Sequence, residues 1–295
     1  MSRALRTDTG EIRFIWKLGI TLILILVLII ISRFSLIFTV QQILILQGTP
    51  SSAAFQNAQI FVAESAEGQT IASSLDFLLM FLLVIALITR FDKHEFHLAN
   101  IGLDMQRNTL PFVLLGLVIG CGLFLGSVMF GVLFGSVEFP ILSNLDQWAV
   151  LSILISSIIF YVLNSFWQEI VFRGYLQNRA VEQYGQMFGI VGITTIFVIF
   201  HGLVQSLSLV GIISGMLLFI FIGLLYDKTK SLYFVGVIHA VLNFLPVLFD
   251  ISWQGLEAVV TYGIALLLLI LVIYKTENGT STRIFSNPPN PPIPT

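Results

Sequence analysis

Long uncharged runs of mainly apolar residues alternate with short polar connectors along this chain. A helix that crosses a bilayer needs about 20 such residues. The predicted spans are 18–38, 71–89, 108–137, 147–168, two spans within 183–226, 231–249 and 258–274. The pattern therefore predicts an all-α, polytopic transmembrane helix bundle of about eight spans. Arg33 and Asp76 interrupt the first two spans, and we expect both side chains to extend toward the lipid headgroups.

The basic residues predict the orientation of these spans. With eight crossings, every Lys and Arg except Arg33 falls at the loops and ends on one side, whereas the loops of the other side carry only acidic charge. Because basic loops stay in the cytoplasm, both termini are predicted to be cytoplasmic. The longest outer connector is 48–74, and its section 55–62 is predicted to lie on the membrane surface.

Composition narrows the class of protein and its partners. Hydrophobic residues make up 57% of the 295 residues and charged residues 10%, and the mean hydropathy is +0.96. These values exclude a soluble globule and predict a multi-pass protein of the cell membrane, with the lipid bilayer as its first partner. The net charge of −2 argues against a nucleic-acid partner. A single cysteine, Cys121, excludes disulfides and cysteine-rich metal sites.

The chain divides into four predicted segments. They are a cytoplasmic N-terminal segment (1–17), N-terminal transmembrane helices with a connector (18–150), a core (151–275) and a Pro-rich cytoplasmic tail (276–295). The core is distinguished by polar clusters that lie inside predicted spans, where ionisable side chains are costly and indicate a functional site.

Three polar clusters lie in the core. The first contains Gln168, Glu169 and Arg173, the second His201, and the third His239 and Asn243; these are the candidate site residues. Residues four apart share one face of a helix, so Glu169 can neutralise Arg173, and His239 lies beside Asn243.

Each cluster also has a structural interpretation. Glu169 and Arg173 can form an ion pair at a helix end, and each histidine can form hydrogen bonds between helices. Together, however, two histidines, an amide and a carboxylate supply what a hydrolase needs to activate water and stabilise an oxyanion. His94 and His97, by contrast, lie in a charged connector without the spacing of a zinc-protease helix, and we expect them to be solvated.

The clusters resemble the CPBP family of intramembrane proteases, which includes type II CAAX prenyl endopeptidases and bacteriocin-processing or abortive-infection proteins. The family motifs are E-E-x-x-x-R, F-x-x-x-H and H-x-x-x-N/D, on successive helices. Here they read QEIVFR from Gln168 to Arg173, FVIFH from Phe197 to His201, and HAVLN from His239 to Asn243. The resemblance covers about 151–249, which identifies 151–275 as a CPBP-like intramembrane protease core.

The resemblance implies an intramembrane endopeptidase, or metalloprotease, that hydrolyses a membrane-associated protein or peptide near the cytoplasmic face. It implies that the first glutamate of the family pattern and His201 activate water, and that His239 and Asn243 line the oxyanion site. Glu169 and Arg173 would hold this arrangement together. A divalent metal ion such as zinc, bound by His201 and His239, is the cofactor that the resemblance suggests.

One position departs from the family pattern: Gln168 stands where the pattern has its first glutamate. A glutamine cannot act as a general base, and Glu169 points about 100° away on a helix. The alternative function is therefore a catalytically impaired member that binds or regulates a membrane partner. If Glu169 faces the site, an enzyme is favoured, whereas Gln168 facing it, with Glu169 bound to Arg173, favours the impaired member.

A proton-coupled transporter, with Glu169, His201 and His239 as a relay, is a third hypothesis. The sequence has no internal repeat of the transporter kind to favour it.

Overall fold

The computed structural model describes residues 12–105, 107–137, 147–203, 205–249, 251 and 255–277, without the side chains of 147–153. Within these ranges the chain is all-helical. The α-helices are α1 (Phe14–Leu46), α2 (Ser51–Glu64), α3 (Ala66–Ala86), α4 (Thr109–Phe134), α5 (Gln147–Glu169), α6 (Asn178–Tyr184), α7 (Gln186–Gly202), α8 (Leu209–Thr229), α9 (Leu232–Leu248) and α10 (Leu256–Glu277). Most of the predicted N-terminal segment 1–17 and nearly all of the predicted tail 276–295 lie outside the described residues.

Each of the eight predicted spans falls on a helix. Six helical stretches are long and apolar enough to cross a membrane, namely Phe14–Leu46, Ala66–Phe91, Thr109–Phe134, Leu154–Tyr184, Leu209–Thr229 and Leu256–Glu277. The chain is thus a multi-pass integral membrane protein. Helices α7 and α9 have 17 residues each, fewer than the roughly 20 that a full crossing takes. The count of eight spans and the cytoplasmic termini stay predictions.

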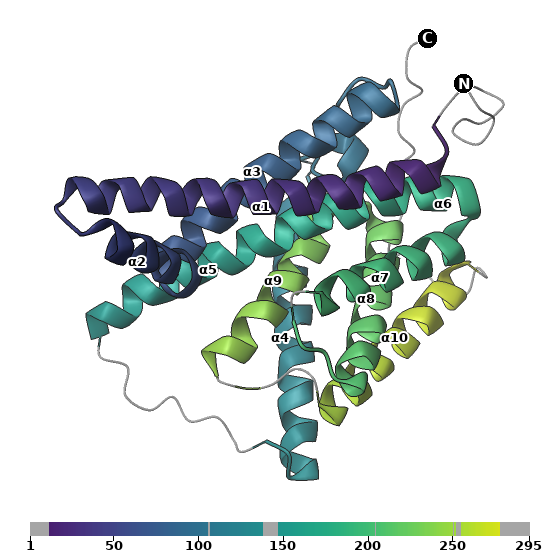
Figure 1. Cartoon of the computed structure of the whole chain (residues 1–295). Helices are drawn as coiled ribbons and strands as arrows, with labels where there is room; N and C mark the ends of the chain where they lie inside the picture. The colour runs from purple at the N-terminus through teal and green to yellow at the C-terminus, as the bar shows by residue number, and fades with distance from the viewer. Residues whose placement is uncertain are drawn as a thin grey trace.

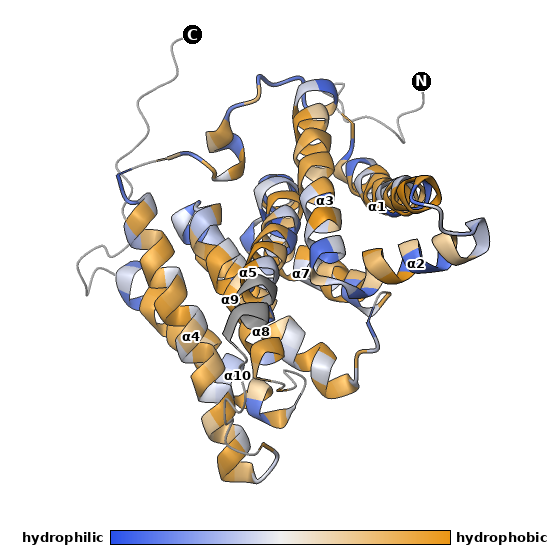
Figure 2. Cartoon of the chain, turned by 90° about the vertical axis from the view of Figure 1, so that its left-hand side faces the viewer, coloured by the Kyte–Doolittle hydropathy of each residue, from blue (hydrophilic) through white to orange (hydrophobic). Residues whose placement is uncertain are grey.

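The helices do not form a simple parallel bundle (Figure 1). Helix α1 crosses the top of the view above α5, whereas α4 and α10 run downward from this layer. The main packing partners are α4 with α9, α3 with α5, α5 with α9, and α8 with α10. Helices α7 and α9 therefore lie among longer helices. Figure 2 shows that apolar residues cover most of α4, including the exposed side chains of Leu114, Val118, Leu125 and Met129, as expected for a lipid-facing helix.

Helix α4 approaches α9 closely because two of its contact residues are glycines. A Cβ atom on Gly116 would lie 2.8 Å from the carbonyl oxygen of Phe234, and one on Gly120 would lie 2.9 Å from the side chain of Val241. A larger residue at either position would push the two helices apart. Small residues at helix contacts are a common device in membrane proteins, and here they set the position of α9.

Helix α5 continues without a break into a π-helical segment, η3 (Ile170–Gln177), and then into α6. Every residue of η3 is buried, including the charged Arg173. The wider turn of a π-helix changes which side chains share a face, and such segments are frequent at functional sites. The segment begins directly after Glu169, so the helix geometry changes within the first sequence motif.

The structure corrects two expectations for the N-terminal region. The stretch 48–74 is mostly helical, because α2 ends at Glu64 and the Ser65 hydroxyl caps α3 by accepting a hydrogen bond from the Gly68 amide at 3.0 Å. Arg33 and Asp76 do not extend separately toward headgroups. Arg33 Nη2 lies 2.6 Å from Asp76 Oδ2, and Ser32 Oγ donates to Asp76 Oδ1 at 2.7 Å. Pairing within the protein compensates charge inside an apolar region.

Candidate active site

A cavity of about 590 Å³ lies among α1, α3, α5, α7, α8, α9 and α10. Its lining includes one residue from each of the three sequence motifs: Gln168 from α5, His201 from α7 and Asn243 from α9. The candidate residues thus divide into two groups, because Glu169, Arg173 and His239 do not line this cavity. These last three are called the sealed cluster below.

Glu169 is the centre of the sealed cluster. Its Oε1 lies 2.8 Å from His239 Nδ1, and its Oε2 lies 3.4 Å from Arg173 Nε. The side chains of Glu169 and Arg173 are both 0% exposed. A buried carboxylate needs a compensating charge and hydrogen-bond donors, and the guanidinium and the imidazole supply them from within the helix bundle.

Arg173 is held by several further contacts. Its Nη2 donates to the carbonyl oxygen of Phe219 at 3.3 Å. Its guanidinium carbon lies 4.6 Å from the ring centroid of Phe197 and 5.2 Å from that of Phe219. Cation–π contacts of this kind are strongest where water is excluded. The positive charge of Arg173 is therefore directed into the protein rather than toward a ligand.

His201 faces the cavity in a defined tautomer. Its Nδ1 lies 3.0 Å from the carbonyl oxygen of Phe197, and a carbonyl can only accept. The proton of the neutral imidazole must then be on Nδ1, which leaves a lone pair on Nε2. The ring packs at 4.3 Å, centroid to centroid, on Phe197. The phenylalanine of the second motif thus orients the histidine through both its backbone and its ring.

His239 uses one ring nitrogen and leaves the other without a partner. Its Nδ1 donates to Glu169, whereas its Nε2 is buried and has no hydrogen-bond partner among the described residues. The ring of Phe219 lies 5.1 Å from the imidazole, centroid to centroid. An unpaired buried nitrogen costs free energy, so a water molecule or ligand group that reached Nε2 would be stabilised.

Gln168 and Asn243 present amides to the cavity. The Oε1 atom of Gln168 is buried and has no hydrogen-bond partner among the described residues. Asn243 Nδ2 donates to the hydroxyl of Ser165 at 3.1 Å, which ties α9 to α5. One hydrogen of this Nδ2 and the oxygen Oδ1 remain available.

The zinc site expected at His201 and His239 stays a prediction. Catalytic zinc usually takes three protein ligands, yet the described residues contain no group of three or more His, Cys, Asp or Glu side chains that could hold a metal ion. Glu169, the nearest carboxylate, is already bound to His239 and Arg173. Among the described residues, the donor set is therefore too small for a catalytic zinc site.

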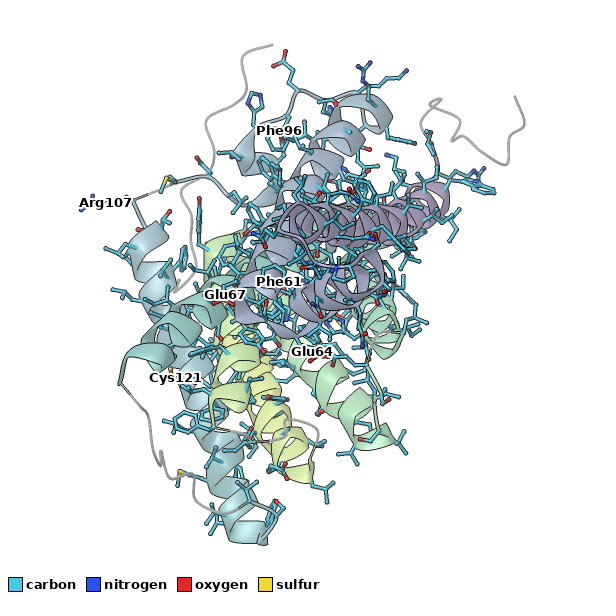
Figure 3. The ribbon with its side chains drawn as sticks, turned by 60° about the vertical axis from the view of Figure 1, so that its left-hand side comes forward. Phe61, Glu64, Glu67, Phe96, Arg107 and Cys121 are labelled. Carbon is cyan, nitrogen blue, oxygen red and sulfur yellow. The ribbon has the colours of Figure 1, made fainter. Side chains whose placement is uncertain are left out.

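His94, His97 and Cys121 do not line the cavity. His94 and His97 are exposed; His97 Nε2 lies 3.7 Å from Glu95, and the His97 amide donates to Asn100 Oδ1 at 2.6 Å. Figure 3 shows their neighbour Phe96 in the connector beyond the end of α3, and Cys121 on α4.

Several cavity residues were not predicted from the sequence. Asn164 lies one helical turn before Gln168, so its i, i+4 spacing was a usable signal. Gln69 and Asp76 line the same cavity from α3, and Gln205 from the segment after α7. No sequence pattern links α3 to the three motifs, because that contact exists only in the folded chain.

The comparisons with known proteins agree with the motifs. Residues 150–245 match the family model of the Rce1-like proteins, described as type II CAAX prenyl endopeptidase Rce1-like. No curated protein matches the chain. The matched segment includes all six candidate site residues and excludes α1 to α4. The core of this membrane protein, residues 150–245, is thus similar to the Rce1-like type II CAAX prenyl endopeptidases, which supports the CPBP resemblance of the motifs.

Proposed function

We propose that this protein is an intramembrane endopeptidase that hydrolyses a membrane-associated protein or peptide near the cytoplasmic face. The observation that carries the proposal is the cavity that Gln168, His201 and Asn243 line together from three different helices. The family match supports hydrolysis of a peptide bond as the reaction class.

The chemistry starts with His201 as the general base. Its Nε2 lone pair takes a proton from a water molecule while the amide of Gln168 holds that water by a hydrogen bond. The water oxygen attacks the scissile carbonyl carbon, and the second hydrogen on Asn243 Nδ2 donates to the oxyanion that forms. The C–N bond then breaks as His201 returns the proton to the leaving amine.

The sealed cluster positions these groups and does not react. Glu169 joins Arg173 on its own helix to His239 on α9, so the contact sets α9 against α5. Asn243 follows His239 by one helical turn and meets Ser165 of α5. The Glu169–His239 contact would thereby position Asn243, the proposed oxyanion donor, on the cavity that Gln168 also lines.

A second candidate function is a catalytically impaired family member that binds a membrane peptide or regulates a partner. It is favoured by the orientation of two neighbouring residues, because Gln168 lines the cavity whereas Glu169 is bound to Arg173 and His239. In this candidate the cavity binds a peptide, and the missing carboxylate at position 168 prevents efficient hydrolysis.

Cleavage assays in proteoliposomes distinguish these functions. The full chain is mixed with a library of membrane-anchored peptides, and products are identified by mass spectrometry. For the endopeptidase we expect His201→Ala to lower cleavage by about 100-fold, the usual scale of a lost general base. The control is His97→Ala, which removes an exposed imidazole and should cleave like wild type.

Equal cleavage by wild type and His201→Ala would overturn the proposed mechanism. No cleavage by wild type, with cleavage gained in Gln168→Glu, would establish the second candidate instead.

A further inference from the structure

Five side-chain amides line the cavity. Gln69, Asn164, Gln168, Gln205 and Asn243 all contribute to its wall. Polar side chains inside a membrane protein commonly hold helices together through hydrogen bonds. Asn164 and Gln69 each use one end of the amide in a bond within α5 or to the neighbouring α2, and the other end makes no hydrogen bond to another described residue.

Asn164 presents a free hydrogen-bond donor. Its Oδ1 accepts from Trp167 Nε1 at 3.1 Å. An indole N–H can only donate, so the orientation of this amide is determined by its partner. Nδ2 of Asn164 makes no hydrogen bond to another described residue, and the side chain is only partly buried. A donor on α5 is thus available to a ligand in the cavity.

Gln69 presents the complementary group, a free acceptor. Its Nε2 donates to the carbonyl oxygen of Ala63 at 2.8 Å. A carbonyl can only accept, so this amide too has a defined orientation. Oε1 of Gln69 has no hydrogen-bond partner among the described residues. The cavity therefore contains an acceptor on α3 and a donor on α5, which together match the N–H and C=O of a peptide group.

The two helices that carry these groups are fastened side by side. Thr70 Oγ1 donates to the carbonyl oxygen of Ser156 at 2.9 Å, and Ser73 Oγ donates to that of Phe160 at 3.3 Å. The cavity wall on α5 runs from Phe160 to Gln168. Eight residues of helix rise about 12 Å, the length of three to four residues of an extended peptide.

The charge of the wall points to an uncharged ligand. Among the described residues, the lining contains one cation, Arg33, and one carboxylate, Asp76, and these two pair at 2.6 Å. A charged substrate side chain would find no unpaired opposite charge in the wall, whereas the free amide groups offer hydrogen bonds to neutral ones.

We propose that Gln69 and Asn164 form a subsite that binds an extended peptide through its backbone, one to three residues from the bond that Gln168 and His201 face. The substrate class is then an unfolded apolar segment, with little preference for particular side chains. This inference rests on the proposed function for the position of the scissile bond. The subsite itself is tested by binding without hydrolysis.

The test compares a peptide with its backbone ester analogues. The probe is dansyl-(Leu-Ala)₃-amide, added to the full chain in lipid nanodiscs, with fluorescence as the readout. Each analogue replaces one amide N–H by an ester oxygen, so side chains and shape are nearly kept while one donor is lost. The protein carries His201→Ala, so that hydrolysis does not disturb the measurement.

We expect the ester at one central position to weaken binding about tenfold, as for the loss of one hydrogen bond. A (Phe-Val)₃ probe should bind within about threefold of the parent, because its backbone is unchanged. In Gln69→Leu the ester analogue should bind as tightly as the parent peptide, because the oxygen that accepted the hydrogen bond from the peptide N–H is gone. Asn164→Asp keeps the acceptor for Trp167 and removes the donor, and should weaken the parent peptide about tenfold.

Asn57→Asp is the matched control for Asn164→Asp, because Asn57 is exposed on α2 and does not line the cavity. The proposal is overturned if no ester analogue binds more weakly than the parent, if the probe does not bind, or if Asn164→Asp binds like Asn57→Asp. Binding that follows the expected pattern while wild type cleaves nothing would overturn only the endopeptidase.

Discussion

Gln168 and Glu169 are neighbours in sequence at the end of α5, yet they belong to two different regions of the molecule. Gln168 lines a cavity together with His201 and Asn243. Glu169 lies in the sealed cluster, 0% exposed, with Arg173 and His239. One residue on a helix turns the side chain by about 100°, which is enough to move it from the cavity to the protein interior.

The first motif therefore has two roles: one residue faces the cavity, and two others hold the helices together. The charges of the first motif, on Glu169 and Arg173, neutralise each other inside the protein and join α5 to α9 through His239. The position that faces the cavity carries a neutral amide. A change in the sealed cluster should therefore act on folding first, whereas a change at Gln168 should act on chemistry first.

The largest expected effect comes from breaking the sealed cluster. Glu169→Ala leaves Arg173 as an uncompensated charge in a fully buried place, which costs about 3–5 kcal/mol of folding free energy. Denaturation of the detergent-solubilised protein with SDS measures this cost.

The double variant Glu169→Gln/Arg173→Met is the control, because it removes both charges while keeping similar side-chain volumes. We expect it to be more stable than Glu169→Ala. If Glu169→Ala unfolds at the same SDS fraction as wild type, the cluster does not hold the helices as described.

The second largest expected effect comes from substitutions at Gln168, which lines the cavity. Gln168→Glu places a carboxylate beside His201, where it can share the proton of the attacking water, and should raise kcat by about 100-fold, within the range of general acid–base catalysis. The same assay on Gln168→Leu should give less activity than wild type, because the water loses its amide partner. Equal rates for all three proteins would mean that position 168 does not face the reaction.

The helices of the fold could largely be predicted from the sequence, because long apolar runs in a membrane protein indicate helices. All eight predicted spans fall on helices. The hydropathy pattern could not reveal that α7 and α9 are short or that α1 lies crosswise to α4 (Figure 1), since both depend on packing between distant segments. The π-helical geometry of η3 was equally hidden, because no local residue pattern distinguishes a π-helix from an α-helix.

The residues of the candidate site could be predicted from the sequence, whereas several of the contacts between them could not. Helix spacing predicted that Glu169 would meet Arg173 and that Gln168 would point elsewhere, and the geometry agrees with both. The bond from Glu169 to His239 joins residues 70 positions apart and has no local signal. The same is true of Gln69 and Asp76, which reach the cavity from α3, outside the family match.

The third effect compares the sealed ion pair with a partly open one. The Arg33 side chain is 37% exposed, whereas that of Arg173 is 0% exposed. Asp76→Asn removes the charge that pairs with Arg33, but Arg33 can still reach solvent or headgroups, so we expect a loss of only about 1 kcal/mol. SDS denaturation checks this value. A loss as large as that of Glu169→Ala would show that exposure does not separate the two pairs.

The smallest expected effect is that of metal removal, and it tests whether the two regions share an ion. His201 lies in the cavity with its Nδ1 bound to Phe197, and His239 lies in the sealed cluster with its Nδ1 bound to Glu169. With only two imidazoles available, zinc binding should contribute little, and dialysis against EDTA should change the unfolding free energy by less than about 0.5 kcal/mol.

Elemental analysis of the purified protein is the parallel measurement. A clear loss of stability on EDTA treatment, reversed by zinc and absent in His201→Ala, would instead mean that both histidines bind one ion and that the cavity and the sealed cluster act as a single site.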